Sequence, residues 1–213
     1  MSHSEGSLVK GESINSMLNA ELKAVDGDFG RCKDCLFEEV SWVVRYLVVD
    51  THKWMPFGRK LVISPISVDV RRSQKGKLFV QLTREQIKNS PPLADHEPVS
   101  RKYEKSLLQY YGYGQYWGGL GLWGAFSRPD ALIDATPDSL EETIDEGSHL
   151  RSVSELEHYR VKCGEQTVGH LVDFFVDDDT WAISAAVVET ENWPRGQGRR
   201  LLPVSEINRI EWP

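Results

Sequence analysis

Two stretches of the chain decide the fold: residues 42–54, WVVRYLVVDTHKW, and residues 181–193, WAISAAVVETENW. In each stretch, two tryptophans stand twelve residues apart and enclose a run rich in β-branched residues. Such a run is typical of a β-strand and contains too few helix-forming residues for a helix. Because the tryptophans recur in the same register, the stretches predict two copies of one strand-rich unit.

The match extends outward from the tryptophans at a spacing of 139 residues. The pairs at this spacing include Gly30 and Gly169, Trp42 and Trp181, and Trp54 and Trp193. Tryptophan is a rare residue type, so this register is hard to obtain by chance. Repetition at a fixed spacing indicates an internal duplication.

Each copy reads as short strands joined by tight turns. Strands are expected at 31–37, 42–50, 60–64, 68–72 and 77–82, and again at 169–176, 181–190, 201–204 and 207–212. Strands this short, with frequent turns, are typical of a small antiparallel barrel or sandwich. The predicted fold is mainly β: two small antiparallel β-barrels joined by a connector. A unit of this size is marginal for a core, so each copy is expected to lean on its twin.

The expected domain organisation has four parts. These are a flexible N-terminus at 1–20, a first barrel at 21–90, a connector at 91–148 and a second barrel at 149–213. A short helix capped by Thr83 ends the first barrel, and Ser100 is expected to cap another helix that runs to about Tyr110. The connector therefore begins with a helix, continues with an aromatic, glycine-rich segment and ends in an acidic loop.

The aromatic segment, residues 110–126 (YYGYGQYWGGLGLWGAF), contains seven aromatic residues, six glycines and no charge. Ordering so many glycines costs entropy, which aromatic burial can offset. One interpretation places the segment over the seam between the barrels. The other makes it an exposed patch for a partner or a second copy, since tyrosine and tryptophan are favoured at interface centres. The candidate surface residues are Tyr110, Tyr111, Tyr113, Tyr116, Trp117 and Trp123.

Both copies resemble the PRC-barrel family, named after the cytoplasmic domain of the photosynthetic reaction-centre H subunit. The resemblance rests on GRCKDCLFEEVSWVVRYLVVDTHKWMPFGRKLVISP with LTREQIKNSPPL in the first copy, and on HLRSVSELEHYRVKCGEQTVGHLVDFFVDDDTWAI in the second. It implies a small, partly open β-barrel in each copy. The family also includes the C-terminal domain of a ribosome maturation factor. A fold resemblance alone does not fix a function.

The resemblance leaves three function classes open. The first is a non-enzymatic scaffold or adaptor that binds an unidentified protein and forms a homodimer. The second is a component or assembly factor of a photosynthetic or electron-transfer complex, and the third is a module for ribosome or RNA maturation. A membrane-bound partner would discriminate the second class, and salt-sensitive RNA binding the third.

Composition narrows the setting. The 213 residues are 40% hydrophobic and 27% charged, which is typical of a globular protein. The net charge of −7 argues against nucleic-acid binding. The part of the chain that would bind a nucleic acid is residues 23–90, which contain 13 basic and 8 acidic side chains. No run of residues could span a membrane and no apolar signal opens the chain, so the expected location is cytoplasmic.

No motif in the sequence predicts catalysis, a metal site or a cofactor, so we expect that the protein is not an enzyme. Cys32 and Cys35 form a CxxC pair, but strand alternation would point them to opposite sides. Their counterparts at the spacing of 139 are Leu171 and Phe174, so we interpret the cysteines as small buried apolar side chains. The acidic run 177–179 is interpreted as a solvated hairpin turn and not as a calcium loop.

Overall fold

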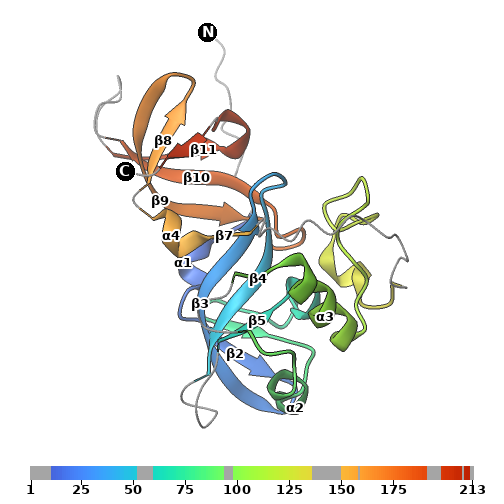
Figure 1. Ribbon diagram of the computed structural model, residues 1–213. Coiled ribbons are helices and arrows are strands. Elements are labelled where there is room, and N and C mark those ends of the chain that lie inside the picture. The colour runs from blue at the N-terminus through green and yellow to red at the C-terminus, as the bar shows by residue number, and fades with distance from the viewer. Residues whose placement is uncertain are drawn as a thin grey trace.

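A computed structural model describes residues 11–51, 60–93, 98–135, 150–157, 159–190, 198–207 and 209–211. Trp54 and Trp193 lie outside the described residues, as do His52 and most of the acidic loop. Strands carry most of the regular structure and form two curled sheets of six strands each (Figure 1). The protein is therefore mainly β.

The first sheet is built around two long central strands. Its order is β5 (Leu61–Ile63), β4 (Val43–Asp50), β3 (Gly27–Glu38), β2 (Glu21–Ala24) and β6 (Lys77–Phe79). Neighbours are antiparallel except β2 and β6, which run parallel. All of β4 is buried but its last residue, which explains why its sequence is an almost unbroken apolar run.

The second sheet has a closely similar order. It consists of β11 (Gly198–Pro203), β10 (Ile183–Thr190), β9 (Gln166–Val176), β8 (Arg160–Cys163) and β12 (Arg209–Glu211). Here every neighbouring pair is antiparallel. Of the strand expected at 207–212, the structure describes Arg209–Glu211 as β12, and β8 lies where no strand was expected.

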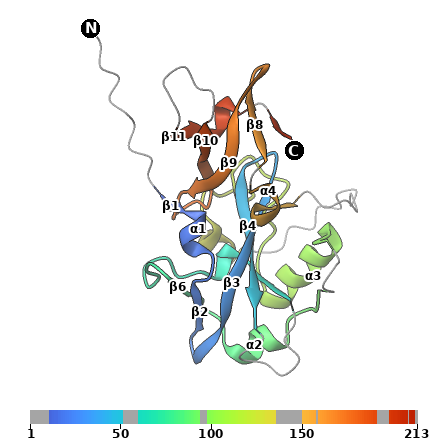
Figure 2. The same ribbon diagram turned by 90° about the vertical axis from the view of Figure 1, so that its left-hand side faces the viewer.

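Each sheet receives a short strand and a helix from the other half of the chain. β1 (Glu12–Ser13) pairs with β9, and α1 (Ile14–Met17) follows it, whereas β7 (Leu150–Ser152) pairs with β3 and is followed by α4 (Val153–Leu156). Figures 1 and 2 both show α1 and α4 at the boundary between the two sheets. The expectation of a flexible N-terminus does not describe residues 12–17, because Ile14 and Met17 are buried in the core.

The two exchanged segments are anchored in the same way. Asp173 accepts hydrogen bonds from the Ser13 hydroxyl at 2.5 Å and from the Asn15 amide at 3.1 Å. Asp34 accepts them from the Ser152 hydroxyl at 2.5 Å and from the Ser154 amide at 3.0 Å. In both cases the serine also caps its helix, so one aspartate fixes the entry of each exchanged segment.

The sheets meet where the two strand-opening tryptophans lie. Trp42 and Trp181 both have positive φ, 55° and 60°, a conformation that is uncommon outside glycine. The Val44 amide donates to the carbonyl of Trp181 at 2.9 Å, and the Ile183 amide donates to the carbonyl of Trp42 at 2.7 Å. These reciprocal bonds join the two sheets directly.

Gly30 and Gly169 occupy positions where the backbone of the neighbouring strand comes very close. A Cβ on Gly30 would lie 2.8 Å from the carbonyl oxygen of Asp50, and one on Gly169 would lie 2.2 Å from that of Glu189. At both positions a neighbouring strand passes too close for a side chain. Glycine is therefore required at these two positions, where β3 pairs with β4 and where β9 pairs with β10.

The helices follow the predicted caps. Thr83 and Gln86 form a capping box at the start of α2 (Arg84–Lys88), and Ser100 caps α3 (Arg101–Tyr111). The described residues also contain three 3₁₀ turns: η1 (Pro65–Ser67), η2 (Pro129–Leu132) and η3 (Val204–Glu206). No helix within the described ranges is both long and apolar enough to cross a membrane.

One expected strand is absent and one alternation argument is corrected. Residues 68–72 form a turn, because the carbonyl of Asp69 accepts from the amides of Arg72 and Ser73; only Val68 bridges Val80. Cys32 and Cys35 do not point apart. The register of β3 shifts between Cys32 and Asp34, and both thiols lie fully buried in one core. The pKa of the Cys35 thiol is raised, mainly by its hydrogen bond with Cys32 and also by burial.

Candidate functional site

The aromatic segment folds back against β4. Of the six residues suggested as a partner surface, Tyr113, Tyr116 and Trp123 are buried, Tyr111 and Trp117 are half-buried, and only Tyr110 is exposed. The buried side chains are unavailable to a partner because the protein itself already covers them. The burial interpretation of the segment therefore holds for these three.

Arg45, near the start of β4, contacts two aromatic rings of this segment. Its guanidinium carbon is 4.0 Å from the centre of the Tyr116 ring and 4.7 Å from that of Trp123. It donates to the carbonyl of Leu122 at 2.6 Å and to the Glu38 carboxylate at 2.7 Å. The buried guanidinium therefore contacts two ring faces and makes short hydrogen bonds through its two terminal nitrogens, whereas its Nε has no hydrogen-bond partner among the described residues.

A second arginine extends this buried network to helix α3. Arg101 donates to the Tyr116 hydroxyl at 2.8 Å, pairs with Glu104 at 3.0 Å and lies 4.3 Å over the ring of Trp117. The Tyr116 hydroxyl in turn donates to Glu104. The network therefore links α3 and the aromatic segment to β3 and β4 of the first sheet.

The pKa values of the two carboxylates in the network are shifted in opposite directions. Burial disfavours the charge on Glu38, but the attraction of Arg45, the Ser41 hydroxyl and Arg101 outweighs it and holds its pKa below the ordinary value. Burial dominates at Glu104 and raises its pKa despite Arg101 and the Tyr116 hydroxyl. Both carboxylates form ion pairs with arginines of the same network, so we interpret the network as structural.

The aromatic segment also reaches the second half of the chain. The indole nitrogen of Trp123 donates to the carbonyl of Thr180 at 2.8 Å, in the turn before β10. Asp177 holds that turn by accepting from the amides of Asp179 and Thr180. The acidic run 177–179 thus organises a turn that the connector contacts.

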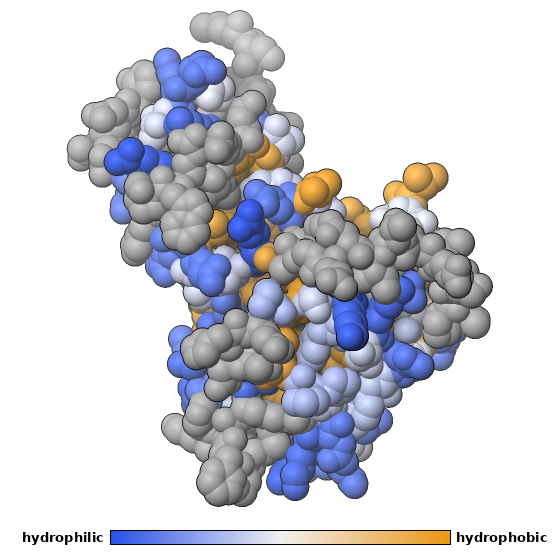
Figure 3. Space-filling view, in the orientation of Figure 1, coloured by the Kyte–Doolittle hydropathy of each residue, from blue (hydrophilic) through white to orange (hydrophobic). Residues whose placement is uncertain are grey.

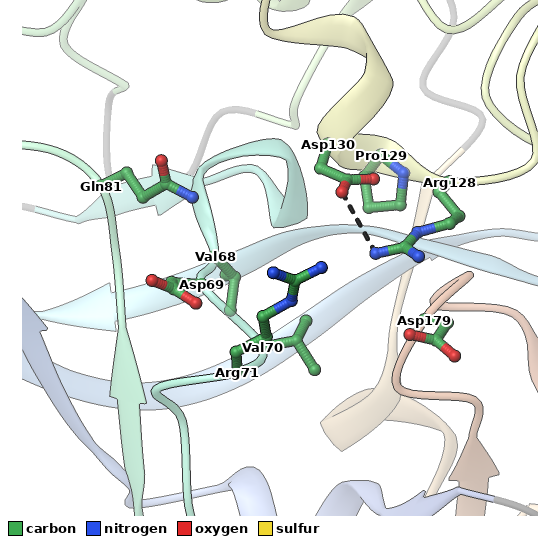
Figure 4. Close-up of a pocket in the computed structure, with 9 residues that line it drawn as sticks. All are labelled: Val68, Asp69, Val70, Arg71, Gln81, Arg128, Pro129, Asp130 and Asp179. Atoms are coloured by element: carbon green, nitrogen blue, oxygen red, sulfur yellow. Dashed lines mark hydrogen bonds and ion pairs between the residues drawn. The ribbon is translucent and has the colours of Figure 1, made fainter.

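A cleft of about 300 Å³ opens where four parts of the chain meet (Figure 4). It is lined by residues after η1, after β6, at the start of η2 and from the turn before β10: Val68, Asp69, Val70, Arg71, Gln81, Arg128, Pro129, Asp130 and Asp179. Arg128 pairs with Asp130 at 3.1 Å, and Figure 4 shows Arg71 between Asp69 and Asp130. Both signs of charge face the opening, so the cleft does not concentrate one charge for a simple ion.

The parts of the chain that the structure describes contain no candidate metal site. There, no three His, Cys, Asp or Glu side chains are grouped so that they could hold a metal ion. Cys32 and Cys35 are buried and lack such a third partner.

Three of the exposed apolar side chains, Val40, Leu120 and Phe126, define a surface that we call the apolar edge. Val40 in the β3–β4 turn is 91% exposed, Leu120 in the glycine-rich loop is fully exposed, and Phe126 is 40% exposed. Figure 3 shows apolar projections over this turn and this loop, on the same side of the protein. The bond from Arg45 to Leu122 ties the loop to β4.

Sequence reasoning missed the apolar edge and the arginine network. One signal was present: Arg45 is the single charge within the apolar run before Asp50, and a charge at the centre of a buried strand needs partners. The exposure of Leu120 could not be predicted from the sequence. Glycines flank it on both sides, so no alternation of apolar and polar residues indicates which way its side chain points.

Comparison with known proteins adds no family assignment. No protein-family model matches the chain, and no curated protein matches it.

Proposed function

We propose that the protein is a non-enzymatic scaffold made of two PRC-type β-barrels, which arose by internal duplication and bind protein through the apolar edge. The single observation that carries the binding role is the exposure of Val40 in the β3–β4 turn and of Leu120 in the glycine-rich loop, which Arg45 holds against β4. Apolar side chains that project from a well-packed surface lose water-exposed area when a partner covers them.

The duplication is supported by contacts that recur at the spacing of 139. Asp34 and Asp173 anchor the exchanged segments, and Trp42 and Trp181 share the same backbone conformation and exchange equivalent hydrogen bonds. The curled sheets are compatible with partly open barrels. The PRC assignment rests on the sequence resemblance.

A second copy of the chain is the partner that we propose for the apolar edge. Two such edges related by a two-fold axis would cover Val40 and Leu120 of both copies, as isologous contacts do. The support under them is preorganised, because the Arg45 network fixes both the β4 strand and the loop. The scaffold would then act as a homodimer.

Sedimentation velocity of the full chain tests this proposal. We expect a concentration-dependent dimer for the wild type, and a monomer for the variant that carries Val40→Asp and Leu120→Asp. The control is Val25→Asp, because Val25 is 56% exposed but lies in the β2–β3 turn. The homodimer proposal fails if the wild type stays monomeric at every soluble concentration, or if the double variant dimerises equally well.

A further inference from the structure

The cleft shown in Figure 4 lies where both halves of the chain meet the connector. The first half contributes the residues after η1 and Gln81, the connector contributes Arg128, Pro129 and Asp130, and the second half contributes Asp179. Small-molecule sites prefer such junctions, and a volume of about 300 Å³ lies at the lower end of the range that they occupy. The cleft therefore has the place and the size of a site for one small ligand.

Part of the cleft wall is apolar. Val68 and Pro129 are buried and Val70 is half-buried, so an apolar group in the cleft would lie against a well-packed surface. A smaller hollow of about 80 Å³ adjoins the cleft, because Val68 and Val70 line both. Five of the nine residues around this hollow are apolar: Met17, Val68, Val70, Leu78 and Trp181. The apolar part of a ligand therefore has its place on the two shared valines.

Arg71 is a cation of the cleft that has no partner within the described part of the protein. Figure 4 shows its guanidinium between Asp69 and Asp130, but neither carboxylate forms an ion pair with it. Asp130 is instead paired with Arg128 at 3.1 Å. Arg71 is exposed, and its side chain has no hydrogen bond or ion pair among the residues that the structure describes. Its guanidinium can therefore hold a carboxylate of a ligand through two parallel hydrogen bonds.

Asp69 offers a negative charge in the same cleft. Its carboxylate accepts one hydrogen bond, from the Arg72 amide at 3.2 Å, and forms no ion pair among the described residues. A carboxylate has about four acceptor positions, so most of them remain for an ammonium group. The lining also contains Asp179, which has an interaction partner in the protein. The backbone of Asp69 is fixed, because its carbonyl accepts from the Ser73 amide at 3.0 Å and from the Ser73 hydroxyl at 2.8 Å. Asp69 is therefore a carboxylate that is held in place and has room for a cation.

We propose that the cleft binds a zwitterionic small molecule, an α-amino acid with an apolar side chain. Its carboxylate would pair with Arg71, its ammonium group with Asp69, and its side chain would lie on the two valines. A simple anion or cation would satisfy only one of these two charges and leave the other partly covered without a counter-charge. A ligand that carries both charged groups on one carbon matches both at once.

The inference goes beyond the proposed protein-binding role and uses a different part of the surface. Neither Val40 nor Leu120 lines the cleft. Dimer formation through the apolar edge and amino-acid binding in the cleft can therefore fail separately.

Isothermal titration calorimetry of the full chain tests the ligand class. The probes are L-leucine, L-methionine and L-phenylalanine, and we expect saturable binding of at least one of them. The amide of the tightest binder lacks the carboxylate, and its N-acetyl derivative lacks the ammonium group. Each derivative should bind about tenfold more weakly, because one charge-assisted contact is lost. Glycine should also bind more weakly, since it has no side chain to cover the valines.

Two substitutions test the residues that would hold the ligand. Arg71→Gln and Asp69→Asn should each weaken binding by about tenfold or more. Asp69→Asn keeps an oxygen that can accept from the Arg72 amide, so the turn is preserved. The control is Lys75→Gln, which removes an exposed charge of the same loop outside the cleft and should leave binding unchanged. Melting temperatures of the three variants check that the fold is retained.

The proposal is wrong if none of the three amino acids binds saturably, or if the amide and the N-acetyl derivative bind as tightly as the free amino acid. It is also wrong if binding is unchanged in both Arg71→Gln and Asp69→Asn. Equal weakening by Lys75→Gln would point to the net charge of the loop and would likewise contradict a site at Arg71.

Discussion

At the scale of single residues, Arg45 shows how a charge is accommodated in a buried strand. Its guanidinium has a carboxylate, a backbone carbonyl and two aromatic faces as partners. Removing it would leave the Glu38 carboxylate partly buried with a weaker partner, Arg101 at 3.8 Å. The arrangement stabilises the fold only as long as both charges are present.

Substitution of one partner is therefore costly. We expect Arg45→Met to lower the free energy of unfolding by about 3 kcal/mol, because Glu38 loses its closest counter-charge. The double variant Arg45→Met with Glu38→Gln should recover part of this loss. Urea denaturation at neutral pH measures both, and a double variant that is no more stable than Arg45→Met alone would contradict the ion-pair explanation.

Trp123 and Tyr110 separate burial from exposure within one aromatic segment. Trp123→Ala should cost about 4 kcal/mol, as expected for loss of a fully buried tryptophan. Tyr110→Ala should cost about 1 kcal/mol or less, because Tyr110 is exposed and loses one hydrogen bond to Gln86. Melting temperatures of the two variants give the comparison, and equal losses would mean that the segment packs differently.

At the scale of secondary-structure elements, helix α3 is fastened by two carboxylates whose pKa values move apart. The folded-state pKa of Glu38 is lowered, so its contribution to stability is present above its unfolded value of about 4.3 and is lost as the pH falls through the folded value. The folded-state pKa of Glu104 is raised, so its ionisation disfavours the folded state, and this cost disappears as the pH falls.

The pH dependence of two variants should thus have opposite signs. Relative to the wild type, the destabilisation by Glu38→Gln should shrink as the pH falls from 7 towards 3. That caused by Glu104→Gln should grow, because the wild type gains stability when Glu104 is protonated. Urea denaturation across this range measures the two differences. Parallel slopes for the two variants would contradict the assigned environments.

The exchanged segments make a second prediction for elements. Asp34→Ala removes the anchor of α4, and Asp173→Ala removes that of α1. Each should lower the free energy of unfolding by about 2 kcal/mol, since each leaves a helix cap without its acceptor. The double variant should show an additive loss, because the two anchors are separate sites. A single variant without effect would show that its exchanged segment contributes little.

Strands and caps were the elements that the sequence predicted best. The runs at β4 and β10 and the caps at Thr83 and Ser100 have local causes: β-branched residues and side-chain acceptors for free amides. The exchange of β1 and β7 could not be predicted, because it depends on which sheet edge each short strand meets. The β-bulge that puts Cys32 and Cys35 on one side likewise breaks the period that the sequence suggests.

At the scale of the whole molecule, two β-units share one apolar core. Phe37 of the first sheet contacts Phe174 of the second at a ring distance of 5.7 Å, and Trp42 lies 6.0 Å from Phe174. The exchanged segments and the paired tryptophan backbones cross the same boundary. Such a boundary holds the two sheets in a fixed position relative to each other.

Native-state hydrogen exchange of the full chain tests this single-scaffold account most directly. The informative amides are those of Val44 and Ile183, which bond across the boundary, compared with amides inside β3 and β9. We predict that these four sets exchange through one cooperative opening, with the same free energy and the same denaturant dependence. Exchange of Val44 and Ile183 at a much lower free energy than the strand interiors would show two units that separate independently, and would contradict the account.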